Sequence, residues 1–142
     1  MRPVLFDSSI YIAGLRRGDE TVVALRRIAA NAPLWLSSVV LEELYAGAGA
    51  REQRVIERLE RDFNRARRIL VPNLSDWTQT GRVLARLADK YGYERIGQSR
   101  LTNDALIAMS AGRVGIQVLT GNERDFSRLA EFRAFHWEVV GL

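Results

Sequence analysis

Four short apolar runs, separated by longer segments with helical periodicity, constrain the fold of this chain more than any other feature. The runs are Pro3–Phe6, Leu34–Leu36, Ile69–Val71 and Ile116–Thr120. Each is short and continuously apolar, which is typical of a strand buried on both faces. Strands that alternate with helices form a mainly parallel sheet covered by helices. We therefore predict an α/β fold of four to five strands, with Trp137–Val140 as a final edge strand.

The segments between the apolar runs predict the helices. Apolar residues recur at helical spacing in residues 10–15, 20–30, 39–48, 51–67, 76–91 and 102–111. In the fifth of these helices, Ser75 or Asp76 is the predicted N-cap, and Trp77 is predicted to point inward with Leu84. No repeat, linker or low-complexity tract divides the 142 residues, so we predict one domain over residues 1–142.

Composition excludes several kinds of active site. The chain has no cysteine, which excludes disulfides, thiolate zinc sites and cysteine nucleophiles. Its single histidine, His136, excludes a zinc site built on several imidazoles. Carboxylates and hydroxyls remain for chemistry, and such hard oxygen ligands favour Mg²⁺ or Mn²⁺.

Charge and hydropathy give an expectation about partners and location. The formal net charge of +4 favours a polyanionic partner such as nucleic acid, although 20 of the 21 cations are arginine, a bias that a GC-rich genome also produces. No run approaches the ~20 apolar residues of a membrane span, and the first residues do not match a signal peptide. We therefore expect a cytoplasmic protein that does not bind membranes.

The helix predicted over residues 51–67 has a charged face as well as an apolar one. Its apolar residues include Val55, Ile56, Leu59 and Phe63, and five arginines line another side: Arg51, Arg54, Arg58, Arg61 and Arg65. The spacing also permits pairs within the helix, for example Glu57 with Arg61. We interpret this arginine face as a solvated surface.

Four acidic residues interrupt apolar segments or follow predicted strands. Asp7 follows the first strand, Asp125 follows the fourth, Asp104 lies near the start of an apolar helix, and Glu43 lies in the helix after the second strand. Ligands of parallel α/β sheets bind beyond the carboxyl ends of the strands, where these acids should meet. Carboxylates gathered there would repel one another unless a divalent cation neutralised them.

Each acid also has a simpler explanation. Asp7 and Asp125 are suitable N-caps, and Asp104 could stabilise a helix N-terminus through the helix dipole. A lone glutamate on a helix is usually solvated. Periodicity does not decide between Glu42 and Glu43, because the two lie about equally far from the centre of the apolar face of their helix. The hypothesis of a shared site therefore depends on the four acids together.

The segments that hold these acids carry a resemblance to a known family. They are Val4–Ser9, Leu36–Leu44, Thr102–Ala108 and Val118–Phe126, and they occur in the family's order across nearly the whole chain. In these segments the chain resembles PIN-domain proteins, and specifically the VapC ribonuclease toxins of toxin–antitoxin pairs. The resemblance implies a PIN-like three-layer sandwich, with a central mainly parallel sheet between layers of helices.

The resemblance also implies an activity and the residues that perform it. It implies a metal-dependent ribonuclease in which Asp7, Asp104 and Asp125 hold Mg²⁺ or Mn²⁺ and Glu43 orients the attacking water or completes a second metal position. Ser9, Thr120 and Asn122 would line the same pocket. Ser8 departs from the pattern, because threonine is frequent at that position in the family. Whether one or two ions act does not follow from the sequence.

Expected partners follow from the same resemblance. The substrate would be RNA, with a small VapB-like antitoxin bound across a hydrophobic groove, and the chain would form a homodimer. Arginines in or next to predicted loops are candidate contacts to the RNA backbone. They are Arg16, Arg17, Arg95 and Arg100.

Three other functions compete with this hypothesis. The first is a DNA-acting or repair nuclease of the same fold, which would use the same acids. The second is a non-catalytic PIN module whose acids bind a structural metal or the basic tail of a partner. The third is a phospho-receiver domain, which needs a lysine late in the chain, but the only lysine is Lys90. A panel of RNA and DNA substrates separates the first from a ribonuclease, and metal-dependent turnover excludes the second.

Overall fold

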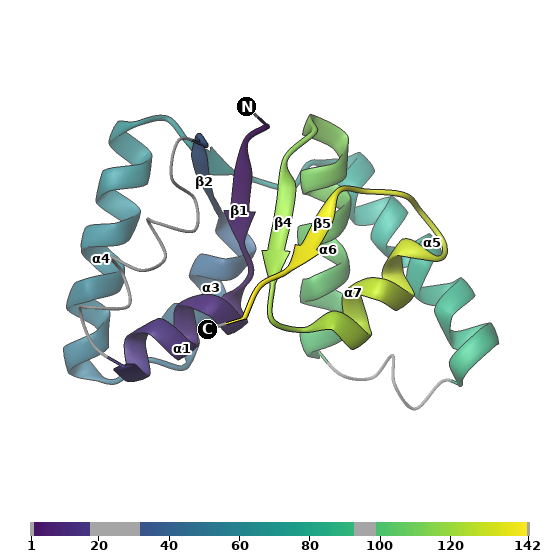
Figure 1. Cartoon of the computed structure of the whole chain (residues 1–142), viewed down its shortest axis with the longest axis horizontal. Coiled ribbons are helices and arrows are strands. Elements are labelled where there is room, and N and C mark those ends of the chain that lie inside the picture. Colours follow the sequence, from purple (N-terminus) through teal and green to yellow (C-terminus); the bar gives the residue numbers. More distant parts are fainter. Residues whose placement is uncertain (1, 18–31, 93–98, 142) are drawn as a thin grey trace.

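The computed structural model describes residues 2–17, 32–92 and 99–141, and it confirms the predicted α/β fold (Figure 1). Its elements are β1 (Val4–Phe6), α1 (Ser8–Arg17), β2 (Leu34–Ser37), α3 (Ser38–Ala46), α4 (Ala50–Arg65), β3 (Ile69–Leu70), α5 (Leu74–Tyr91), α6 (Ser99–Val114), β4 (Gln117–Thr120), α7 (Glu123–Ala130) and β5 (Trp137–Val139). The helix predicted over residues 20–30 lies outside the described residues. None of the helices that the structure describes is long and apolar enough to cross a membrane.

The five strands form one sheet in the order β3-β2-β1-β4-β5, and every neighbouring pair is parallel. The chain therefore builds the sheet outward from β1 to β3 and then returns to the other side of β1 for β4. Right-handed crossovers place α1 and α4 on one face of such a sheet and α5 and α6 on the other. Figure 1 shows this arrangement, with α1 and α4 on the left of the view and α5 and α6 on the right. A crevice opens at the carboxyl ends of β1 and β4, where the strand order reverses.

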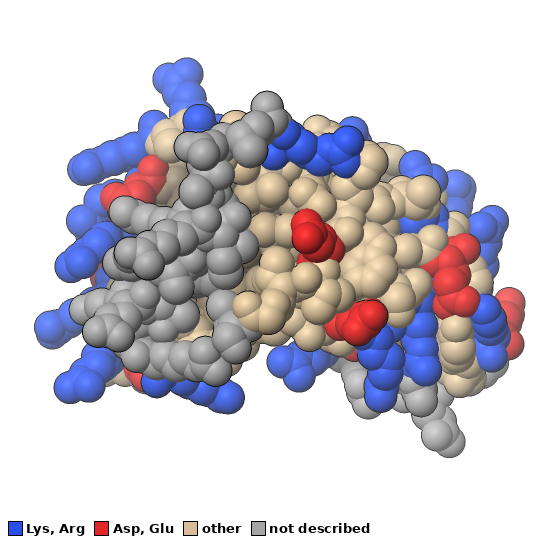
Figure 2. All heavy atoms as spheres, viewed as in Figure 1, with Lys and Arg blue, Asp and Glu red and all other residues tan. Residues whose placement is uncertain are grey.

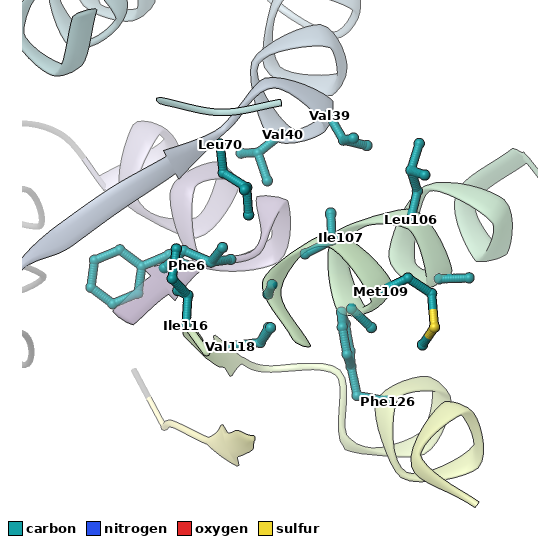
Figure 3. Close-up of a cluster of buried hydrophobic side chains, with 14 of the residues drawn as sticks. Phe6, Val39, Val40, Leu70, Leu106, Ile107, Met109, Ile116, Val118 and Phe126 are labelled. Carbon is teal, nitrogen blue, oxygen red and sulfur yellow. The ribbon is translucent and has the colours of Figure 1, made fainter. Parts of the chain in front are cut away.

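The core lies on both faces of the sheet. All three residues of β1 are buried, as expected for a central parallel strand. Figure 3 shows a cluster to which β1, β4, α3, α6 and α7 contribute, including Phe6, Val118 and Phe126. Helix α6 is buried without interruption from Asp104 to Ala111, so it behaves as a central core helix. Asp104 is thus a carboxyl group at the start of a buried segment.

Two details of α5 differ from the sequence predictions. The N-cap is Asn73, not Ser75 or Asp76. The Asn73 side chain accepts a hydrogen bond from the Asp76 backbone N–H, and the Asp76 carboxylate accepts one from the Asn73 N–H, both at 2.9 Å. Trp77 was predicted to point inward but is 55% exposed, because the buried positions of this first part of α5 are the polar residues Asp76 and Thr80.

Candidate active site

Asp7 lies where β1 ends and α1 begins, at the carboxyl edge of the sheet. Its two carboxylate oxygens accept hydrogen bonds from the hydroxyls of Ser9 and Thr120, each at 2.5 Å. Burial raises the pKa of Asp7, while these hydroxyls and the backbone N–H groups of Ile10 and Ser9 oppose that rise. Asp7 immediately precedes α1, which is the position of an N-cap, and it also lies at the carboxyl edge of the sheet. Its position is therefore compatible with both explanations of Asp7, as an N-cap and as a member of a shared acidic site.

Asp104 comes from the opposite face of the sheet, on α6. The structure starts α6 at Ser99, not at Thr102 as predicted, so Asp104 is the sixth residue of the helix and lies beyond its first turn. The helix dipole therefore does not account for this acid, because the effect falls off within the first turn. Burial, followed by the negative charges of Asp7, Glu43 and Asp125, raises the pKa of Asp104 to about 8. Four acids from four helical segments thus influence one another at this carboxyl group.

Asn122 joins two of these acids. Its side-chain amide donates to Asp125 at 3.1 Å and to Asp104 at 3.4 Å. Its side-chain oxygen caps α7 by accepting from the Asp125 backbone N–H at 3.3 Å, so Asn122 and not Asp125 is the N-cap. The Asn122 backbone N–H in turn donates to the Thr120 hydroxyl at 2.8 Å. A continuous chain of hydrogen bonds therefore runs from Asp7 through Thr120 and Asn122 to the other two aspartates.

The structure separates Glu42 from Glu43. Glu42 is exposed, whereas Glu43 is half-buried and has one carboxylate oxygen, Oε1, that is buried without a hydrogen-bond partner. Burial is the main cause that raises the pKa of Glu43, and the charges of Glu42 and Asp7 add to it, while hydrogen bonds from Ser8 and Asn103 lower it. Glu43 is therefore the glutamate that belongs to the acidic pocket of Asp7, Asp104 and Asp125.

Sequence reasoning assigned no role to two residues that contact Glu43. The side chains of Ser8 and Asn103 both lower the pKa of Glu43, and Asn103 donates a hydrogen bond to Glu42 at 3.4 Å. Asn103 could have been found from its place beside Asp104 on the same helix. No sequence signal distinguished Ser8, because an adjacent Ser9 offers the same chemistry.

The candidate RNA-binding arginines are dispersed. Arg100 is exposed on the first turn of α6, and its positive charge lowers the pKa of Asp104. Arg16 is exposed near the end of α1, and Arg17 is the last residue of that helix. Arg95 lies outside the described residues. Arg124, which was not predicted, forms an ion pair with Asp125 at 3.7 Å.

The donor chemistry of the pocket suits a hard divalent cation, although the ligands are not assembled. Every candidate ligand is a carboxylate, the unpartnered Glu43 Oε1 faces no donor, and the repulsion felt by Asp104 is the kind that a cation relieves. Within the described ranges, however, no three acidic or histidine side chains already stand where they could hold one ion. The residues fit the charge and donor preference of Mg²⁺ or Mn²⁺, and binding would require side-chain rotation.

Comparisons with known proteins identify the family and the fold. The family model described as the PIN domain matches residues 4–132. The solved structure of DNA-bound VapBC from Salmonella typhimurium is similar, with 23% identity, 98% of each chain covered and a TM-score of 0.70. VapBC2 from Rickettsia felis, bound to a promoter DNA fragment, is 22% identical over 97% of this chain and 98% of that chain, with a TM-score of 0.68. VapBC-1 from nontypeable Haemophilus influenzae is 21% identical over 96% of each chain, with a TM-score of 0.63.

No curated protein matches the sequence. At these identities the solved structures establish the fold alone. The family match, in contrast, spans most of the chain and includes all four acids of the pocket. The chain therefore belongs to the PIN-domain family.

Proposed function

We propose that the chain is a metal-dependent endoribonuclease and the toxin of a toxin–antitoxin pair. The observation that carries the proposal is the chain of hydrogen bonds through Thr120 and Asn122 that joins Asp7, Asp104 and Asp125. Burial and three neighbouring carboxylates also raise the pKa of Asp104 to about 8. A fold gains no stability from acids that repel one another in a crevice, so a cation that neutralises them is the simplest reason for their presence. The PIN-domain match and the similarity to VapBC structures support the same reading.

In the proposed active site, different residues would bind the cation, position its ligands and accept a proton. Asp7, Asp104 and Asp125 would hold the cation, and Thr120 and Asn122 would keep the first and last of these acids in place. When bound, Mg²⁺ or Mn²⁺ would neutralise charge on the scissile phosphate and lower the pKa of water. Glu43 would orient the attacking water and accept its proton, a role that suits a carboxylate whose pKa is raised by burial.

The proposed reaction is a hydrolysis in which the water oxygen attacks phosphorus and the bond from phosphorus to the 3′ oxygen breaks. The departing 3′ oxygen takes a proton, which leaves 5′-phosphate and 3′-hydroxyl ends. Arg100 is exposed beside the pocket and would contact the phosphate that flanks the cleaved bond.

An apolar groove supports the proposal of an antitoxin partner. A cavity of about 220 Å³ lies between α1 and α4, and its lining among the described residues is mainly hydrophobic, including Tyr11, Leu15, Leu59 and Phe63. A segment of an antitoxin would lie in this groove and extend to the acidic pocket, as the resemblance to VapC proteins implies. A homodimer is proposed on the same resemblance.

Cleavage assays with purified full-length chain test the activity. We expect cleavage of single-stranded or structured RNA in Mg²⁺ or Mn²⁺, none with a chelator, and little cleavage of DNA of the same sequence. Asp7→Asn and Asp104→Asn should each lower the rate by at least about 100-fold, because each removes a charge that would hold the cation.

The exposed Asp89, on α5, provides the control, because Asp89→Asn removes the same charge outside the pocket and should leave the rate unchanged. RNA cleavage by Asp104→Asn at the wild-type rate would refute the assignment of the site. Efficient cleavage of DNA but not RNA would identify a DNA-acting nuclease instead.

A further inference from the structure

The outer surface of α4 carries a straight line of arginines that the acidic pocket does not explain. Arg51, Arg54, Arg58, Arg61 and Arg65 follow one another at alternating intervals of three and four residues, and all five are exposed. At 3.6 residues per turn they fall within an arc of about 80° and extend over about 21 Å of the helix. We call these five residues the α4 arginine line. Figure 2 shows basic side chains gathered along the edge of the molecule where α4 lies.

None of the arginines of the α4 arginine line forms an ion pair with the acids of its own helix. The ion pairs found among the described residues are Lys90–Glu131, Arg113–Asp76 and Arg124–Asp125, none of which involves α4. The Glu57–Arg61 pair that the sequence permitted is therefore not formed. Of the other acids of α4, Glu60 instead accepts a hydrogen bond from the Tyr45 hydroxyl at 2.6 Å. The arginines thus remain available to an outside partner.

The arginines of this line repel one another. Each has a like charge three or four residues away on the same face, and like charges at these spacings destabilise a helix. Glu57 and Asp62 have the spacing to offset part of this repulsion, but neither forms an ion pair with an arginine of the line. An anionic partner that lies along α4 would relieve the repulsion, which favours a binding surface over the solvated face that the sequence suggested.

The direction of α4 connects the line to the acidic pocket. Strands β2 and β3 are parallel, so the connection between them must return from the carboxyl edge of the sheet to the amino edge. Helix α4 completes that return, which places Arg51 toward the carboxyl edge and Arg65 toward the amino edge (Figure 1). The acidic pocket lies on the carboxyl edge. The line therefore starts at the edge that holds the pocket and leads away from it.

We propose that the α4 arginine line binds the sugar–phosphate backbone of the nucleic-acid strand that is cleaved in the pocket. Successive arginines are separated by about 5 Å of helix rise, and a nucleic-acid strand presents one negative charge per nucleotide at regular intervals. Guanidinium groups bind phosphate through two parallel hydrogen bonds. The proposal rests on the proposed nuclease function and names the surface that holds the substrate outside the pocket.

Binding without cleavage tests the proposal. Fluorescence anisotropy would follow a labelled single-stranded RNA of about 20 nucleotides, and DNA of the same sequence, on full-length chain in a chelator. The double variant Arg54→Ala with Arg58→Ala should weaken binding roughly tenfold at physiological salt, and it should reduce the slope of log K against log salt by about 1.4. With Mg²⁺ added, KM for the RNA should rise while kcat stays unchanged.

A matched control lies on the other face of the sheet. Arg82 and Arg86 of α5 are also exposed and also four residues apart, so their double alanine variant removes the same charge at the same spacing. It should leave affinity and salt slope near those of the wild type. Alanine favours helix at all four positions, and thermal unfolding would verify that both variants fold.

The outcomes separate this proposal from its rivals. Equal weakening by both double variants would overturn it, because the effect would then be one of net charge. Labelled polyglutamate, measured in the same assay, represents an acidic protein partner. If the α4 double variant loses polyglutamate binding but keeps RNA binding, the proposal is overturned in favour of such a partner. If the α4 double variant loses the same affinity for RNA and for DNA, the arginines contact the phosphates and do not distinguish ribose from deoxyribose. If the α4 variant loses RNA binding but wild-type chain cleaves no RNA, the nuclease proposal fails and the binding surface stands.

Discussion

Within the described part of the chain, Asp7 is held in place by hydrogen bonds from hydroxyl groups, not by positively charged side chains. Thr120 is fully buried, and its hydroxyl donates to Asp7 while accepting a hydrogen bond from the Asn122 backbone N–H. A hydroxyl can serve two partners in this way because it is both donor and acceptor. Neutral donors stabilise the ionised carboxylate and leave space beside it for a metal cation. An arginine in their place would fill that space with its own positive charge. The arrangement thus keeps Asp7 ordered and still available as a ligand.

Replacement of Thr120 by valine tests this arrangement. Thr120→Val keeps the shape of the side chain but leaves a buried carboxylate oxygen and a buried backbone N–H without partners. We expect a loss of about 1–3 kcal/mol in the free energy of unfolding, measured by denaturant titration. The pKa of Asp7 should rise further, because a hydrogen bond that lowers it is lost. The acidic limb of the pH–rate profile should therefore move to higher pH.

Thr120→Ser is the conservative control, because serine retains the hydroxyl and should restore most of the activity. If valine and serine have the same effect on the pH profile, the hydroxyl does not act through Asp7, and packing alone explains the loss.

At the residue level, the sequence indicated which acids were candidates for the site, but it did not predict the contacts that each of them makes. Asp7 and Asp104 could be selected because they interrupt apolar segments. The choice of Glu43 over Glu42 depends on how α3 packs against α6, which periodicity within α3 does not contain. Likewise, the hydrogen bond from Asn122 to Asp104 joins the start of α7 to α6, and only the tertiary structure brings these two residues together.

At the level of elements, strands were easier to predict than helix ends. The parallel strands β1, β2 and β4 match continuous apolar runs, because burial on both faces demands such runs. The start of α6 was misplaced because Ser99 to Leu101 continue the helix into a polar stretch that looked like a loop. The N-cap of α5 was misplaced because Asn73, Ser75 and Asp76 are all good capping residues, and the reciprocal capping box between Asn73 and Asp76 was not recognised.

Helices α5 and α6 are joined by one polar contact at the start of α5. The carboxylate of Asp76 accepts from the Arg113 guanidinium at 3.0 Å and also completes the capping box with Asn73. Asp76 is 2% exposed, so its charge depends on these partners for compensation. One buried side chain thus caps one helix and fixes it to the end of the next.

Asp76→Ala should accordingly destabilise the fold without changing the chemistry. We expect a loss of about 2–4 kcal/mol in the free energy of unfolding, because the variant removes a cap and leaves Arg113 unpaired. The rate of RNA cleavage per folded molecule should be unchanged, since these residues lie away from the pocket. Ser75→Ala provides the control: if Asn73 is the cap, this exposed neighbour should be neutral within about 0.5 kcal/mol.

At the scale of the whole molecule, the sheet order explains why the acids meet. Because the strand order reverses beside β1, the loops after β1 and β4 diverge to opposite faces and leave a crevice between them. Asp7 enters it from β1 and Asp125 from the segment after β4, while α3 and α6 bring the other two acids. The parallel arrangement that buries the strands therefore also concentrates negative charge at one edge.

This concentration of charge should appear as a pH dependence of stability in the metal-free chain. Below pH 3.8, the ordinary pKa of an aspartate, Asp104 is protonated in both the folded and the unfolded state. Between that pH and about 8, the folded chain keeps a proton that the unfolded chain has lost. The folded state binds more protons in this range, so the contribution of Asp104 to the free energy of unfolding falls as pH rises.

Asp104→Asn removes that contribution while keeping the size of the side chain. In a chelator, the variant should be more stable than the wild type by about 3–5 kcal/mol near pH 8, and the difference should vanish near pH 4. Asp89→Asn, at an exposed position of α5, should show no comparable difference. Mn²⁺ or Mg²⁺ should stabilise the wild type increasingly as the pH rises, because the cation competes with the proton, and it should stabilise Asp104→Asn much less. A wild type and variant that differ by the same amount at every pH would show that Asp104 holds no extra proton. The carboxylates would then not be close enough to repel one another, and they could not share a cation.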